Sequence, residues 1–260
     1  MIRCERWSFL FLLMLISGCA HIAPFSPPYM PFSEKEITNL ISNLKEQQES
    51  VSSFQGIGRL RYKVGDRESE LSLFAVGCRP FKIRLEITHP WGKPIFHIVV
   101  DERKISALSI VDNKFFQGPL TSLNMKRFIK FDLELDSAWK IFSGRIPILP
   151  YDRADSVKAH EITLYNKRNE VVEIISFFPQ NLLPRTVSFP KKGLSIMLSE
   201  FKEGDSGMYP SGIKIVDRDE DQLLDIRYTS LEFNKLIPEE IFQLNPPPDF
   251  KIIQLGYNGN

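Results

Sequence analysis

The spacing of apolar residues along the chain changes from a helical period to a strand period and back. Between residues 37 and 51, apolar positions recur every three or four residues, which predicts an amphipathic helix. Ser33-Glu34-Lys35-Glu36 precedes this run and matches a capping box, with Ser33 as N-cap and Glu36 bonding back to it. After Gly56 the period becomes two, and Leu60 begins an alternation of apolar with basic residues that predicts a strand.

Further strand-like runs follow at close intervals, which indicates an antiparallel meander. They cover residues 71–76, 82–88, 94–100, 104–111 and 114–117, and they resume at 158–166, 170–178, 185–189, 194–201, 212–217 and 223–234. The interval between the two groups carries two predicted helices, one over 121–130 and one that Asp136 caps and Gly144 ends. Pro238 opens a last short helical turn. The pattern therefore predicts about eleven or twelve strands with three helical segments.

Some predicted strands, such as Ile95–Val100 and Val171–Phe178, carry apolar residues on both faces. An ordinary half-solvated sheet does not need this, so a second layer must cover them, and the helices at 34–51 and 121–144 are the only candidates. We therefore expect a mainly β protein of the α+β class, with helices on the concave side of a strongly curved antiparallel sheet. The apolar space between helices and sheet is either packed core or a ligand cavity, and the pattern alone does not decide between them.

The N-terminus has the order of a secretory signal. Arg3 and Arg6 precede an apolar run over residues 7–16, and small residues follow it up to Ala20. A transmembrane anchor is the alternative, but a span needs about 20 apolar residues and this run has roughly half of that. Ile16-Ser17-Gly18-Cys19 is similar to the bacterial lipobox, in which the Cys thiolate takes a diacylglyceryl group. We therefore expect residues 1–18 to be removed and Cys19 to carry diacylglycerol and an N-acyl chain as a permanent anchor.

Residues 19–33 read as a tether between this anchor and a folded domain over 34–260. Pro24, Pro27, Pro28 and Pro31 favour extended backbone without a core of its own. At about 3.1 Å per residue the tether spans roughly 40 Å. In enteric bacteria an Asp after the lipidated Cys retains a lipoprotein in the inner membrane, so Ala20 indicates an outer-membrane location facing the periplasm.

Charge and cysteine content exclude several classes of partner and site. The full chain has 33 basic and 32 acidic residues, and removal of residues 1–18 leaves 31 of each, so charge gives no reason to expect nucleic acid as a partner. Of the three Cys, Cys4 is removed and Cys19 is acylated, which leaves Cys78 alone without a possible disulfide. We interpret Cys78, at the end of a predicted strand, as a structural rather than a reactive thiol.

Five short segments of the chain resemble the LolA/LolB superfamily of periplasmic lipoprotein carriers and receptors, LolB-type lipoproteins most of all. They are Val51–Gly58, Arg79–Glu86, His89–Pro94, Phe115–Gly118 and Tyr209–Ile215. The resemblance spans nearly the whole mature chain, although extra strand material around 157–201 makes this chain longer than LolB. It implies an incomplete, strongly bent antiparallel barrel closed by a helical lid, whose hydrophobic cavity accepts the acyl chains of lipoproteins.

The resemblance also implies a membrane-insertion loop at Pro90-Trp91-Gly92. In LolB an exposed apolar residue, followed by Gly on a loop between two early strands, is needed to place cargo in the membrane, and Trp91 occupies that position here. An indole at a loop tip suits the membrane interface. The alternative is that Trp91 folds back over the end of the barrel as core.

We find no motif for catalysis or for a cofactor. No G-x-S-x-G, H-E-x-x-H, P-loop or C-x-x-C occurs, and the four His residues are scattered, so we expect neither an enzyme nor a metal site. Asp217–Asp221 is similar to the start of a calcium loop, but Gln222 and Tyr228 stand where Gly and Glu are needed, which favours a charged hairpin turn.

Two hypotheses for function remain. The first is an outer-membrane lipoprotein that takes lipoprotein acyl chains or a related amphiphile, including from a periplasmic LolA-like carrier, and passes them to the membrane. The second is a structural or assembly lipoprotein that acts as an anchored protein-binding module.

Overall fold

The structure is a computed structural model that describes residues 30–257. The predicted signal peptide, Cys19 and most of the tether lie outside the described residues, and the chain from Pro31 onward forms one compact unit. This unit has three α-helices and two short 3-10 helices: α2 (Glu34–Glu49), α3 (Ser122–Ile129), α4 (Leu135–Phe142), η1 (Pro190–Lys192) and η2 (Glu239–Phe242). None of the helices within residues 30–257 combines the length and the apolar character needed to cross a bilayer.

The predicted starts of the helices are confirmed at α2 and wrong at α4. Ser33 caps α2 in a complete capping box, since its side chain accepts from Glu36 N–H and the Glu36 carboxylate accepts from Ser33 N–H at 2.8 Å. At α4 the N-cap is Glu134, whose side chain makes no capping bond. Asp136 instead lies within the first turn and accepts from Lys140 Nζ at 2.6 Å, one turn further along.

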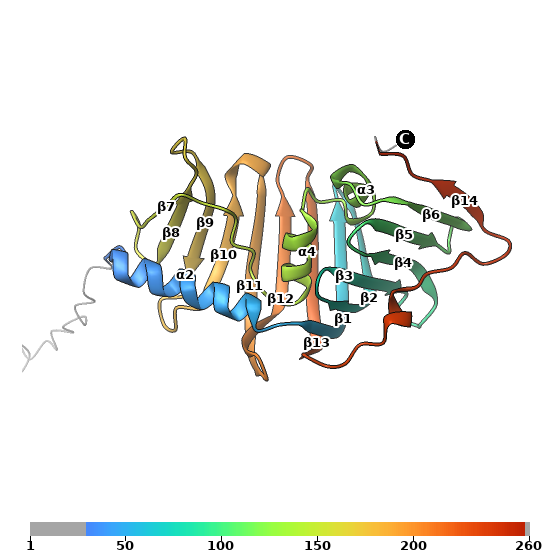
Figure 1. The fold of residues 1–260 in the computed structure, drawn as a ribbon, viewed down its shortest axis with the longest axis horizontal. Coiled ribbons are helices and arrows are strands. Elements are labelled where there is room, and N and C mark those ends of the chain that lie inside the picture. Colours follow the sequence, from blue (N-terminus) through green and yellow to red (C-terminus); the bar gives the residue numbers. More distant parts are fainter. Residues whose placement is uncertain (1–29, 258–260) are drawn as a thin grey trace, which may run out of the picture. The chain divides into compact units, whose positions relative to one another are not determined.

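All fourteen strands of the described chain belong to one sheet that does not close on itself (Figure 1). The order is β14-β6-β5-β4-β3-β2-β1-β13-β12-β11-β10-β9-β8-β7, and every pair is antiparallel except β14 with β6. The strands are β1 (Ser53–Val64), β2 (Arg67–Cys78), β3 (Lys82–Thr88), β4 (Pro94–Val100), β5 (Lys104–Ser109), β6 (Lys114–Pro119), β7 (Arg153–Asp155), β8 (Glu161–Tyr165), β9 (Val171–Phe177), β10 (Pro184–Phe189), β11 (Leu194–Gly204), β12 (Gly207–Asp217), β13 (Gln222–Phe233) and β14 (Lys251–Gln254). The predicted number of eleven or twelve is therefore too low, because the two edge strands β7 and β14 are only three and four residues long.

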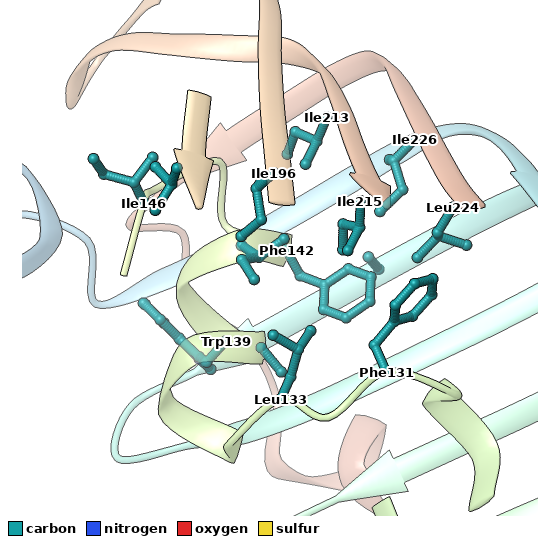
Figure 2. Packing of buried hydrophobic residues seen from close by; sticks show 14 of the residues in the cluster. Phe131, Leu133, Trp139, Phe142, Ile146, Ile196, Ile213, Ile215, Leu224 and Ile226 are labelled. Carbon is teal, nitrogen blue, oxygen red and sulfur yellow. The ribbon is translucent and has the colours of Figure 1, made fainter. Parts of the chain in front are cut away.

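The three α-helices pack on one face of this sheet, which we call the helix face. Ile37 of α2, Met125 of α3 and Trp139 of α4 belong to one buried cluster with alternate residues of the strands. Figure 2 shows how Phe131, Leu133 and Phe142 lie over the side chains of β11, β12 and β13. The strand residues of the cluster are in register across neighbouring strands, for example Ile196 with Ile215 and Ile213 with Ile226. The predicted helical layer over a curved sheet is therefore confirmed in its arrangement, whereas closure of the sheet by a lid remains a prediction.

The opposite face, which we call the outer face, has a second, smaller apolar group at β2 to β6. Its buried residues, all outside the main cluster, are Val76, Val99, Leu108, Phe115 and Phe242. Phe242 belongs to η2, and Arg84 on the outer face of β3 donates to the carbonyl oxygen of Ile241 at 2.8 Å. The expectation that only helices 34–51 and 121–144 cover the second face of β4 is therefore wrong. The C-terminal segment around η2 lies against this face.

Candidate functional site

The predicted membrane-insertion loop is the turn between β3 and β4. His89 N–H donates to the Lys93 carbonyl oxygen and Gly92 N–H to the His89 carbonyl oxygen, both at 2.8 Å, so the turn has its own hydrogen bonds. Gly92 has φ of +87°, a conformation that a residue with a side chain rarely adopts, and Pro90 precedes the tip. The backbone at Trp91 is therefore held in a defined position.

The Trp91 side chain lies outside the core. It is 74% exposed, and its only aromatic neighbour among the described residues is His89, whose ring stacks on the indole with centroids 4.3 Å apart and planes 6° apart. The alternative in which Trp91 folds back as core does not fit this exposure. The stacked imidazole restricts the indole, so that an amphipathic ring is held out into solvent at the end of the hairpin.

A group of three partly buried aromatic side chains lies on β4, β6 and α3. Phe128 of α3 has its ring 5.8 Å from that of Phe96 on β4 and 5.4 Å from that of Phe116 on β6, and we call these three the α3 aromatic cluster. Phe96 pairs with Ile87 on β3, one step before Thr88 and Pro94 at the end of the hairpin that carries Trp91. The helix face is therefore apolar and incompletely covered close to the Trp91 turn.

Beneath α4, by contrast, the helix face is tightly filled. Trp139, Ile215 and Ile226 have no exposed surface, and Phe142 is only 3% exposed. A side chain that lined a space large enough for water would retain accessible surface on that side, so no such space touches these residues. Of the two alternatives that the sequence leaves open, packed core therefore holds for the region under α4.

Buried polar groups hold the connector after α4 in place. Gln48 of α2 donates to the Ile146 carbonyl oxygen at 2.7 Å, and the Glu173 carboxylate of β9 accepts from Leu149 N–H at 2.8 Å. Arg145 donates to the carbonyl oxygens of Ser206 and Met208 at 2.7 and 2.8 Å. Burial lowers the pKa of Arg145 to about 10, so the guanidinium stays charged at neutral pH.

Glu173 is the unusual member of this group. Its side chain has no exposed surface, and its Oε1 has no hydrogen-bond partner among the described residues. Burial raises its pKa to about 8, against the smaller opposing effects of the Leu149 hydrogen bond and the Lys140 charge. The sequence analysis did not single out this residue. The available signal was a carboxylate on the buried side of the run Val171-Val172-Glu173-Ile174-Ile175.

The other residues considered for a reactive or metal-binding role, Cys78 and the Asp217–Asp221 segment, have structural roles. Cys78 is half-buried, and burial raises the pKa of its thiol, which disfavours the reactive thiolate. The Asp217–Asp221 segment is the hairpin turn between β12 and β13, where Asp217 Oδ1 accepts from the N–H groups of Asp219 and Glu220 at 3.1 Å each. Within residues 30–257, no group of three or more His, Cys, Asp or Glu could hold a metal ion.

Comparisons with known proteins identify the fold. Neither the known protein families nor the curated proteins give a match to the sequence. Among solved structures, a LolA superfamily protein from Nitrosomonas europaea superposes with a TM-score of 0.52 at 16% identity, over 79% of this chain and 97% of that one. A DUF1329 family protein from Desulfovibrio piger superposes with a TM-score of 0.54 at 9% identity, over 79% of this chain and 95% of that one. The chain therefore has a LolA/LolB-like fold, as the sequence motifs predict.

Proposed function

We propose that this protein is a non-enzymatic, lipid-handling lipoprotein of the bacterial envelope. It binds the acyl chains of another lipoprotein, or a related amphiphile, and passes them to the outer membrane that holds its own anchor at Cys19. The LolA/LolB-like fold supports lipid or lipoprotein binding in the periplasm as the general activity. The observation that carries the LolB-like part of the proposal is the exposed Trp91 on a hydrogen-bonded turn beside the α3 aromatic cluster.

Acyl chains would enter at the α3 aromatic cluster rather than beneath α4. Insertion under α4 would have to displace fully buried side chains such as Trp139, whereas Phe96, Phe116 and Phe128 are only partly covered. Burial of an acyl chain yields about 0.8 kcal/mol per methylene, so even part of a chain provides several kcal/mol to offset the movement of one aromatic ring. Transfer to the membrane then requires only a modest difference in affinity between carrier and receptor.

The test is a two-step transfer assay with the unacylated Cys19→Ala protein. A LolA-like carrier loaded with a fluorescently labelled lipoprotein is the donor, and vesicles added afterwards are the acceptor. The Cys19→Ala protein should take the cargo, and Trp91→Glu should leave uptake unchanged but block release to the vesicles. Val157→Glu is the matched control, since Val157 is 69% exposed in the turn between β7 and β8.

The outcomes separate the parts of the proposal. A Cys19→Ala protein that takes no cargo would overturn the lipid-handling function altogether. Normal release by Trp91→Glu would overturn the role of the turn. Phe128→Asp places a charge in the α3 aromatic cluster and should reduce uptake, and unchanged uptake would refute entry at this place.

The packed core beneath α4 favours a second candidate, a structural or assembly lipoprotein that binds another protein. Trp139 and the neighbouring strand residues leave no space for a ligand there. Native mass spectrometry of the purified lipoprotein distinguishes the two, because a carrier should retain a copurified amphiphile. Protein without bound lipid that is recovered in an envelope complex would favour the assembly role.

A further inference from the structure

A second exposed apolar side chain lies on the turn next to Trp91. Val111, in the turn between β5 and β6, is 71% exposed. The two turns are adjacent because β4 and β5 are hydrogen-bonded neighbours, and Ile110 N–H donates to the Ile95 carbonyl oxygen at 3.0 Å just inside the tips. Trp91 and Val111 therefore project from the same end of the sheet, on neighbouring hairpins.

Two lysines flank this end of the sheet side by side. Lys114 begins β6 directly after the Val111 turn, and Lys251 begins β14 in register with it, so both side chains point to the same face. Neither lysine has an ion-pair partner within residues 30–257. Like charges on neighbouring strands repel each other, so the pair destabilises the isolated protein. A bound anion would remove this repulsion.

The nearest acidic side chain of the turn is already engaged. Asp112 Oδ2 accepts from the Ser109 hydroxyl at 2.8 Å, which directs this carboxylate back toward its own strand. Lys93, in the Trp91 turn, adds a third amine, and the opposing acids are Asp112 and, before β14, Asp249. Three amines against two carboxylates leave an excess of one positive charge around the two tips, and both lysines of the pair lack an acidic partner among the described residues.

We propose that Trp91, Val111, Lys114 and Lys251 form one contact surface for a bilayer that contains anionic phospholipid. The inference rests on the proposed function, in which the Trp91 turn meets the membrane, and extends it by naming a second insertion point and the charge of the headgroups. Two apolar side chains on separate convex tips suit insertion between lipids, since they offer no groove in which a protein segment could dock. The lysines would lie at the level of the phosphates and fix the protein with its α3 aromatic cluster close to the surface.

The test measures vesicle binding by flotation of the unacylated Cys19→Ala protein, with no cargo present. Vesicles are phosphatidylcholine alone or phosphatidylcholine with phosphatidylglycerol. Binding should be stronger to the anionic vesicles and should weaken with added salt. The double variant Lys114→Gln with Lys251→Gln should lose about 25-fold in affinity for anionic vesicles, since each amine near such a surface contributes about five-fold.

Matched variants test the apolar half of the surface. Val111→Asp should reduce binding to neutral vesicles about ten-fold, the value of one buried Val side chain, and binding to anionic vesicles about 50-fold, because the new carboxylate is also repelled by the headgroups. Val157→Asp, at an equally exposed position, and Lys167→Gln with Arg168→Gln, in the turn between β8 and β9, should bind as the parent does. Circular dichroism should confirm that all variants are folded.

Each result supports or overturns the proposed contact surface. Equal binding to neutral and anionic vesicles, or full binding by Val111→Asp, would overturn the inference. If Trp91→Glu still blocks cargo release while the lysine and Val111 variants bind normally, the inference fails and the proposed function stands. If the vesicles are bound as expected but no cargo is taken up, the contact surface stands and the proposed function fails.

Discussion

The replacement Glu173→Gln tests whether this buried carboxylate makes the stability of the protein depend on pH. Glu173 lies on β9 with no exposed surface, and its carboxylate accepts from Leu149 N–H in the connector after α4. Gln has nearly the same shape and keeps a carbonyl acceptor for Leu149, but it cannot ionise. The variant therefore removes the charge and leaves the hydrogen bond in place.

The size and sign of the effect follow from the pKa of Glu173. Burial raises this pKa from 4.5 to about 8, so between these values the folded protein holds a proton that the unfolded chain releases. The free energy of unfolding must therefore fall as pH rises from about 4.5 and level off above about 8, by about 1.4 kcal/mol per pH unit and about 5 kcal/mol in total. At pH 7 the loss is about 3 kcal/mol.

Urea unfolding at pH 5, 6, 7, 8 and 9 measures this effect as the difference in stability between Glu173→Gln and the parent. The difference should move in favour of Gln with rising pH, whatever its starting value at pH 5. Glu203→Gln, an exposed carboxylate on β11, is the control and should show no such trend. A difference that stays constant from pH 5 to pH 9 would refute the argument from burial.

Three further replacements test the packing and hydrogen bonds that position the site. Trp139→Ala should destabilise the protein by about 3 to 5 kcal/mol in urea unfolding, because the indole has no exposed surface; a loss below 1 kcal/mol would contradict a tightly packed region. Tyr228→Phe removes the donor to the Phe142 carbonyl oxygen at 2.9 Å and should cost about 1 kcal/mol, and an unchanged melting temperature would contradict a role for this bond in holding α4. Gly118→Ala places a Cβ 2.5 Å from the Leu255 carbonyl oxygen, which should loosen the pairing of β14 with β6. Hydrogen exchange of the β14 amides should therefore be faster than in the parent, while that of the β1 amides is unchanged. Unchanged exchange in β14 would show that the edge strand adapts to the methyl group.

The sequence predicted the helices and strands that are determined by residues close together in the chain. Ser33 and Glu36 satisfy the first turn of α2 by themselves, and the alternation in β1 reports one buried and one solvated face. The β7 and β14 strands were missed because they have only three and four residues, too few to show a period. Their pairing depends on partners elsewhere in the chain: β14 lies beside β6, which is more than 130 residues earlier.

The sequence also did not predict that the segment around η2 covers the outer face, because this packing again depends on residues far apart in the chain. The residues before β14 include Pro246-Pro247-Pro248 and show no amphipathic period, so nothing in their order indicates a packing role. Phe242 is buried where Lys82 and Arg84 on β3 bind the segment around η2 through a carboxylate and carbonyl oxygens. Burial of this kind arises from tertiary contacts between distant residues, which a hydrophobicity pattern does not contain.

The two halves of the helix face differ in a way that bears directly on function. Around α4 and the connector that follows it, the buried hydrogen bonds of Gln48, Arg145 and Glu173 reinforce the packed core, so movement there would leave buried polar groups unpaired. Around α3 the backbone is also held, since Asn124 donates to the carbonyl oxygens of Pro119 and Gly256 at 2.9 and 3.1 Å, but the rings of the α3 aromatic cluster are partly covered and make apolar contacts with one another. Apolar contacts can be exchanged for contacts with an acyl chain at little cost, whereas broken buried hydrogen bonds cannot be replaced by a hydrocarbon. Lipid uptake should therefore move the rings of the α3 aromatic cluster and leave α4 fixed, at the side of the sheet that carries the proposed membrane-contact turn.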